Sequence, residues 1–313
     1  MLNNLIQNYF GVGIFIIIAL ALIFPYTAVM LHPTSTLFLF LLMLTNSLLI
    51  DWSKLKNIYQ HIKLVLFANV VIFIITPFIV FLFANSLLDD DQYIYGAVFS
   101  ALTPAALIAP FFTKTLKGNK ELSYSILLSS MILSPIAIPI MLKVIIGPLL
   151  PISASLIFKD ILLILPLPIV LAYITWQINP KVNKSIQKNG PILNFIFLGS
   201  LIFILFGTAF NKFNFNSTNN VLLIKLLILA FLQDFAIIIL WGFIARKFKD
   251  KKDSLALIIS VSMKNIAIAA GLLLLHSPKA ALAPAIGFIA HAFLFTPIVL
   301  KKLLKSNPSR DNF

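Results

Sequence analysis

The sequence predicts an all-α polytopic membrane protein, and three observations lead to this fold class. Hydrophobic residues make up 60% of the 313 residues and charged residues only 11%, which leaves too little polar surface for a soluble domain. Apolar segments of about 20 residues, enough to span a bilayer core about 30 Å thick, recur along the chain. Basic residues gather in every second connection between these segments. We therefore expect ten transmembrane helices.

The segments follow one another closely, without a linker that would separate soluble domains. We expect one membrane domain over residues 1–305 and a polar tail over residues 306–313. The predicted spans are residues 9–27, 34–50, 62–87, 93–113, 122–146, 156–178, 191–210, 221–245, 254–276 and 282–302. Turn-forming residues mark connections at Leu31-His32-Pro33, Asp89-Asp90-Asp91, Asn179-Pro180 and Ser277-Pro278.

The formal charge of +14 is a topology signal rather than a nucleic-acid footprint, because of where the charges lie. The basic connections are 51–61, 114–120, 181–188, 246–252 and 301–313. The opposite connections contain only Lys212 and Lys279. By the positive-inside rule both termini are cytoplasmic, which requires an even number of spans. We expect an integral protein of a bacterial inner membrane, with lipid as its surroundings and no nucleic-acid partner.

The sequence lacks the residue patterns of an intramembrane enzyme. There is no cysteine, so disulfides, thiol nucleophiles and thiolate metal sites are excluded. No pair of histidines stands with a glutamate at metal spacing, no Gly-x-Ser-x-Gly is present, and the one glutamate, Glu121, lies in a cytoplasmic connection. We expect no enzymatic activity, no metal and no cofactor.

Ten spans divide into two sets of five, and because five is odd the second set must enter the membrane in the opposite orientation. The predicted inverted repeats cover about residues 1–150 and 151–305. Segments four and nine carry helix-breaking features at matching positions: Pro104 and Pro110 in the first, and the polar stretch from Ser260 to Asn265 in the second. Broken helices at membrane depth are typical of transporter binding sites.

Two ionisable residues lie deep in consecutive segments. Lys264 is ten residues from Ser254, about 15 Å along a helix, and Asp234 is eleven residues from Ala245, about 16 Å. Both are too deep for their side chains to reach the headgroups. Because the two segments are joined by a short connection, we expect antiparallel neighbours and a direct contact between the charges. Its role is either ion coupling or a purely structural salt bridge.

The pattern of residues from Leu37 to Ile145 resembles the bile acid:sodium symporter family. The matching features are a short second span, the turn Asp51-Trp52-Ser53-Lys54, Pro77, the break at Pro104, Gly118-Asn119 and Leu133-Ser134-Pro135. The stretch from Ser260 to Asn265 resembles the Glu-Val-Gly-Met-Gln-Asn of that family's ninth helix, and His291 falls where its tenth helix carries a substrate-facing His-Asn.

This resemblance implies a core of helices 3–5 and 8–10, with helices 4 and 9 broken and crossing. Helices 1, 2, 6 and 7 form a panel, and transport proceeds by movement of one against the other. The expected cargo is a small organic, anionic solute. The residues assigned to its binding are Thr103, Pro104, Ser260, Met263, Asn265 and His291.

The departures from the family affect its two sodium sites. Ser260 stands in place of a sodium-binding glutamate, Lys264 in place of a glutamine, and Ala109-Pro110 in place of Ser-Asn. A hard cation needs several oxygen ligands, so sodium coupling is not expected. Lys264 would instead supply a tethered ammonium near the carbonyl end of a half-helix. With Asp234 as its counter-ion, protonation of the aspartate would free the lysine to attract an anion, which predicts proton coupling.

Other interpretations of the same residues stay open. A cation/proton antiporter could use the same Asp234–Lys264 pair, with the fold kept and the cargo changed. His291 could line the cavity, shuttle protons or only pack, and Asn265 could bind solute or satisfy a free carbonyl.

Overall fold

The computed structural model describes residues 2–50, 52, 61–147, 154–211, 217–245 and 250–294. All regular structure in these residues is helical, apart from one isolated antiparallel bridge. The elements are α1 (Leu2–Ile23), α2 (Pro25–Leu31), η1 (His32–Thr34), α3 (Ser35–Leu48), α4 (Ile62–Val70), η3 (Val71–Ile75), α5 (Thr76–Leu87), α6 (Asp91–Leu102), α7 (Ala109–Thr115), α8 (Lys120–Ile145), α9 (Ala154–Ile164), α10 (Pro166–Ile178), α11 (Pro180–Asn211), α12 (Ser217–Ala245), α13 (Lys251–Ser262), α14 (Ile266–His276) and α15 (Leu282–Leu294).

Five helical runs in the described residues are long and apolar enough to cross a membrane. They are Pro25–Leu48, Ile62–Leu87, Lys120–Ile145, Ser155–Ile178 and Ile192–Asn211. Shorter apolar helices, including Ile266–His276 and Leu282–His291, are too short to cross by themselves. The protein is therefore an integral membrane protein, and the count of ten spans stays a prediction. Residues 295–313, which include the predicted tail, lie outside the described residues, as do most of the connections 51–61 and 246–252.

One predicted boundary is wrong. We expected a turn at Leu31-His32-Pro33, but these residues continue a helical run from Pro25 to Leu48 through the single 3-10 turn η1. The first helix instead ends at Ile23, and Pro25 takes the first position of α2. Proline is tolerated there because the first N–H groups of a helix have no partner inside it.

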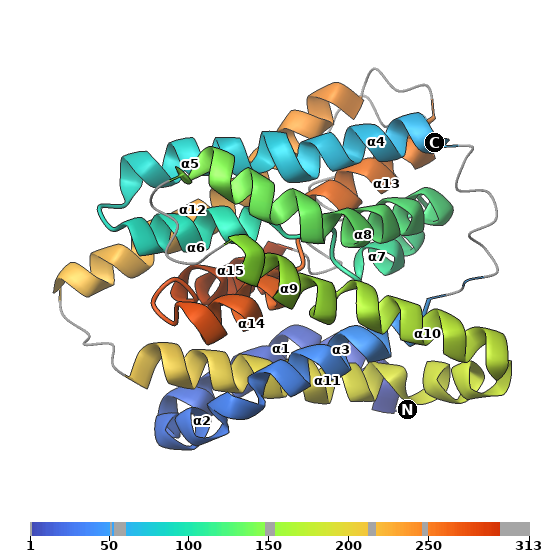
Figure 1. Ribbon diagram of the computed structural model, residues 1–313, viewed down its shortest axis with the longest axis horizontal. Coiled ribbons are helices and arrows are strands. Elements are labelled where there is room, and N and C mark those ends of the chain that lie inside the picture. Colours follow the sequence, from blue (N-terminus) through green and yellow to red (C-terminus); the bar gives the residue numbers. More distant parts are fainter. Residues whose placement is uncertain are drawn as a thin grey trace.

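The helices form two sides with α14 and α15 between them (Figure 1). On one side, α11 packs against α1, α2 and α3, and α10 packs against α3; we call these five helices the α11 layer. On the other side lie α4 to α8, α12 and α13, with α12 packed against α13, α15, α5 and α6. α14 touches both sides, since it packs against α3 and α11 as well as α6 and α15.

Two histidine side chains connect the C-terminal end of α14 to η1 and to α9. His32 Nε2, in η1, lies 3.1 Å from the carbonyl oxygen of Leu274. His276, the last residue of α14, forms an ion pair with Asp160 on α9. The end of α14 is thus fastened both to η1, beside the α11 layer, and to α9.

Candidate functional site

The two interrupted helices meet at their interruptions. One helix stops at Leu102 and restarts as α7, and the other stops at Ser262 and restarts as α14. Ala106 N–H donates to the Met263 carbonyl at 2.7 Å, and Asn265 N–H donates to the Pro104 carbonyl at 2.9 Å. These reciprocal bonds pair backbone groups that would otherwise be unsatisfied at the centre of the molecule.

The first interruption follows from its prolines. Pro104 has no N–H, and Thr103 before it adopts an extended conformation with ψ 148°. Pro110 lies in the first turn of α7, where the missing N–H costs nothing. Within the break, the N–H of Ala105 donates to Ser130 Oγ on α8 at 3.2 Å. Two backbone donors inside the break, those of Ala105 and Ala106, are therefore paired with groups from other elements.

The second interruption places a lysine in the protein interior. Lys264 is 1% exposed, and its Nζ donates to the carbonyl oxygen of Ile72 at 3.0 Å. It follows the carbonyl end of α13, where the helix dipole favours a positive charge. A buried ammonium needs such acceptors, because burial removes its hydration.

A π turn explains why the Ile72 carbonyl can accept this bond. In η3 the N–H of Thr76 donates to Val71, five residues back, instead of to Ile72. The next residue, Pro77, has no N–H that could donate to Ile72 in the same pattern. The Ile72 carbonyl is therefore left without a helical donor, and Lys264 Nζ takes that place.

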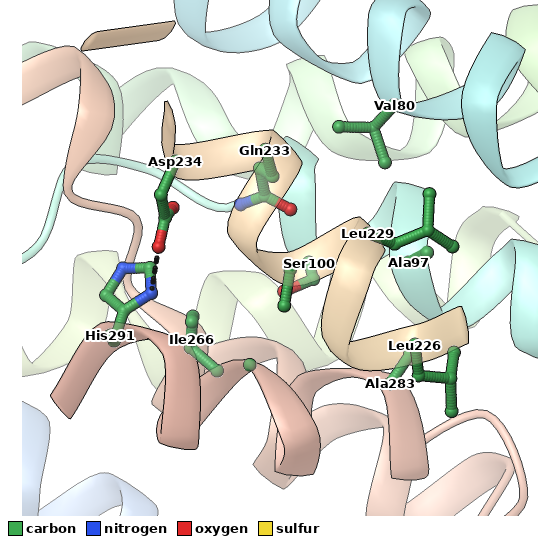
Figure 2. A pocket seen from close by; sticks show the side chains of 12 residues that line it. Val80, Ala97, Ser100, Leu226, Leu229, Gln233, Asp234, Ile266, Ala283 and His291 are labelled. Carbon is green, nitrogen blue, oxygen red and sulfur yellow. Dashed lines mark ion pairs between the residues drawn. The ribbon is translucent and has the colours of Figure 1, made fainter. Parts of the chain in front are cut away.

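Asp234 on α12 pairs with His291 on α15. His291 Nδ1 lies 2.9 Å from Asp234 Oδ2, and the aspartate side chain is 1% exposed. Figure 2 shows the two side chains pointing toward one another from facing helices. We expected Asp234 to contact Lys264, but the ion pair of Asp234 is with His291, while Lys264 binds Ile72. Helices α12 and α13 do pack together, yet the second break turns Lys264 toward η3.

A small pocket lies beside this pair, between α5, α6, α12, α14 and α15. Its walls are mostly apolar, and its polar groups come from Ser100, Gln233, Asp234 and His291 (Figure 2). It has room for about one water molecule, so no organic solute fits in it in this conformation. The pocket lies away from the α11 layer, inside the bundle around α12.

The other residues assigned to the site are buried around the junction. Ser260 Oγ is 2.8 Å from Ser123 Oγ on α8, and Thr103 Oγ1 donates to the carbonyl of Ser100. Met263 packs in a small apolar cluster with Ala106, Ala109, Phe112 and Ile259. The side chain of Asn265 points in a different direction from that of Lys264, since Asn265 Nδ2 lies 3.9 Å from the sulfur of Met43 on α3. The second break thus directs Asn265 toward the α11 layer and Lys264 away from it.

Sequence reasoning assigned Asp234, Lys264 and His291 to the site but missed their partners. The Ile72 carbonyl was not recognised, although Thr76-Pro77 in the middle of a span is a signal for an unpaired carbonyl a turn earlier. The pairing of His291 with Asp234 had a weaker signal, namely the similar predicted depth of the two residues in the spans 282–302 and 221–245.

Comparison with known proteins places these observations in a family. The model of the "Sodium Bile acid symporter family" matches residues 36–214, more than half of the chain. This chain belongs to that family. A protein of Bacillus subtilis (strain 168), named "Uncharacterized sodium-dependent transporter YocS", is 23% identical over 292 residues, which cover 90% of this chain and 87% of the relative. The chain is accordingly a transporter and not an enzyme.

In this member of the symporter family, acidic ligands for a cation are scarce near the breaks. Of the acidic side chains that the structure describes, Asp234 is the buried one, and it is paired with His291. The described residues contain no group of three or more acidic or histidine side chains that could hold a metal ion. The ionisable side chain at the junction itself is Lys264.

Further ion pairs join the connection between α5 and α6 to the connection between α14 and α15 and to α12. Lys279 binds Asp90, and Lys225 Nζ is 3.3 Å from Asp89. The hydrogen bond from Lys279 to Asp90 raises the pKa of that lysine. Partial burial works toward a higher pKa for Asp90, but its bonds with Lys279 and Gln92 hold that pKa below its usual value. These pairs are partly exposed and contribute little stability.

Proposed function

We propose that the protein is a secondary active transporter that carries a small organic anion by alternating access, without the two sodium ions of its family. The observation that carries this proposal is the buried Lys264 side chain at the junction of the two broken helices. A cation fixed by a covalent tether occupies the position where a mobile cation would need oxygen ligands. The sodium dependence in the name of the Bacillus relative belongs to that protein and is one outcome that the test below distinguishes.

The proposed architecture is ten spans in two inverted repeats, about residues 1–150 and 151–305, with both termini cytoplasmic in a bacterial inner membrane. The α11 layer and α9 correspond to the panel, and the remaining helices to the core. Its support is the matching placement of the two interruptions, each in a helix followed by a short connection and another helix. Transport then requires the core to move against the panel around the junction.

The solute site is proposed at the boundary between the junction and the α11 layer. Asn265 supports this location, because its side chain points to Met43 on α3 rather than into the bundle. An anion bound there is stabilised by two features of the junction. The first is the N-terminal end of α14, which carries a partial positive charge, and the second is the nearby ammonium of Lys264.

The proton-coupling proposal keeps Asp234 and Lys264 but acts through space rather than through a salt bridge. The charge of Asp234 acts on Lys264, although their side chains bind different partners. Protonation of Asp234 leaves the ammonium uncompensated in a poorly solvated interior. A bound organic anion restores the balance, so proton and anion favour each other's binding.

Transport by the purified protein in liposomes tests the proposed function. Vesicles loaded with unlabelled acetate, lactate, succinate or glycocholate receive the corresponding labelled acid outside, with sodium or with choline as the only added cation. We expect counterflow of at least one acid, equal in the two salts and faster at lower pH. Counterflow that needs sodium contradicts the sodium-free proposal. Uptake of labelled sodium against a proton gradient, without transport of any acid, identifies the cation/proton antiporter instead.

A further inference from the structure

The pair of Asp234 and His291 has the features of a binding site rather than of a structural bridge alone. The carboxylate is buried, the imidazole side chain is 15% exposed, and both border the pocket described above. A water molecule needs two to four polar partners, and the pocket offers Ser100, Gln233, Asp234 and His291. We propose that Asp234 and His291 together bind one proton, which reaches them through water in this pocket, and that this proton is the coupling ion of the proposed transporter.

Charge balance indicates why occupation of this site would affect the solute. With Asp234 ionised, His291 neutral and Lys264 charged, the interior carries no net charge. One added proton gives it one positive charge, whichever member of the Asp234–His291 pair holds it. A net charge in a poorly solvated interior is costly, so the protonated protein gains from binding one monovalent anion. This inference rests on the proposed function for the identity of the anion, but the proton site itself does not.

The other titratable groups near Asp234 and His291 do not change this count of charges. The titratable groups that act on Asp234 are His291 and Lys264. α5, which also packs against α12, has no titratable residue. The remaining described titratable side chains on the helices packed against this pair are Asp91, Tyr93 and Tyr95 on α6, Lys225 on α12, Lys251, Lys252 and Asp253 on α13, and His276 on α14. Tyr95 packs edge-to-face on Phe99, and most of the others lie at helix ends.

The chain provides an internal control in a second pair of the same kind. His276 and Asp160 also form an ion pair, but they join the end of α14 to α9 and do not border the pocket. A general effect of removing an aspartate beside a histidine would appear at both pairs. A site-specific effect on proton coupling appears at Asp234 and His291 only.

Nuclear magnetic resonance of the four histidines in the full-length protein, in lipid nanodiscs, tests the proton site without any solute. The side-chain nitrogen signals of selectively labelled histidine are followed from about pH 5 to about pH 9. Variants His291→Gln and His276→Gln assign the two signals. We expect the His291 signal to titrate, and Asp234→Asn to shift its midpoint by about one pH unit or more. Asp160→Asn should leave it in place and shift the signal of His276.

Two results would overturn the proton site. One is a His291 signal that does not change over this pH range in the unaltered protein, a result that needs no variant to fold. The other is a midpoint that Asp234→Asn leaves unchanged. Counterflow in liposomes then separates this inference from the proposed function. Acid transport whose rise at low pH is lost in Asp234→Asn but kept in Asp160→Asn supports both, whereas a titrating pair in a protein that moves no acid contradicts only the proposed function.

Discussion

The two helix interruptions satisfy their backbone groups in the same way, by hydrogen bonds to each other, but they differ in their side chains. The first spans the residues between Leu102 and Ala109, depends on proline, and contains no ionisable side chain. The second spans only Met263 to Asn265, has no proline, and contains a buried lysine. Each donates one N–H to a carbonyl of the other. The first break therefore supplies backbone pairing only, whereas the second also contributes an ionisable side chain, which the Ile72 carbonyl holds.

Removal of the charge should have the largest effect on transport. Lys264→Met keeps much of the length of the side chain but removes the ammonium that binds Ile72. We expect acid counterflow to fall by about 100-fold, equivalent to roughly 3 kcal/mol of lost anion stabilisation. Lys225→Met, which removes a partly exposed lysine paired with Asp89, is the matched control and should change counterflow little. Equal losses in the two variants would refute a special role for Lys264.

Loss of one bond between the breaks should mainly reduce stability. Ala106→Pro removes the N–H that donates to Met263 and leaves that buried carbonyl unpaired. The expected cost is about 1–3 kcal/mol in the free energy of unfolding, seen as a lower midpoint of thermal unfolding. Ala106→Gly keeps the N–H and separates the hydrogen bond from the loss of the side chain. A proline variant as stable as the glycine variant would show that the two breaks do not support each other.

Restoring a backbone N–H donor next to the π turn should weaken the hydrogen bond between Lys264 and the Ile72 carbonyl. Pro77→Ala adds an N–H where the helix lacks one, so the Ile72 carbonyl can bond within its own helix instead of to Lys264. We expect acid counterflow to fall about fivefold, corresponding to roughly 1 kcal/mol for one hydrogen bond. Pro139→Ala in α8 is the control, since Pro139 also lies inside a helix but takes no part in the hydrogen bond between Lys264 and Ile72. Counterflow that falls as much in Pro139→Ala would remove the π turn from the explanation.

The smallest effect is expected from loss of the hydrogen bond between the first break and Ser130 on α8. Ser130→Ala removes the hydroxyl that accepts the N–H of Ala105. The midpoint of thermal unfolding should fall by about 2–4 °C, for a loss of roughly 1 kcal/mol. Ser134→Ala serves for comparison, because its hydroxyl bonds only to Met131 in its own helix. If Ser134→Ala is the more damaging change, the first break does not depend on α8 in this way.

The sequence was sufficient to predict the interruptions, because proline and a polar stretch in an apolar helix have direct backbone consequences. Pro104, Pro110 and the residues from Ser260 to Asn265 all lie where the helices stop or restart. The family assignment followed from the same residues and is confirmed. Both Asp234 and Lys264 are buried in the protein, and their depth in the membrane stays a prediction.

The partners of the charges were not predictable from the sequence. Counting residues along a helix gives depth, but the direction of a side chain depends on rotation about the helix axis and on local irregularities. At Lys264 the chain has already left α13, so helical spacing no longer indicates where the side chain points. Its acceptor, Ile72, depends on a π turn, which shifts the hydrogen bonds by one residue without a change of hydrophobic pattern. His291 lies on a helix that is not adjacent in sequence to α12.

The histidine contacts at the end of α14 bear on how far this helix can move relative to its neighbours. His32 and His276 join that end to η1 and to α9 through Leu274 and Asp160. Any displacement of α14 away from these elements must first separate both contacts. The opposite end of α14, at Asn265, is held by different elements, since Asn265 N–H donates to the Pro104 carbonyl in the first break. The two ends of α14 are therefore anchored independently, one to η1 and α9 and the other to the first break, so a movement of α14 that spares one set of contacts strains the other.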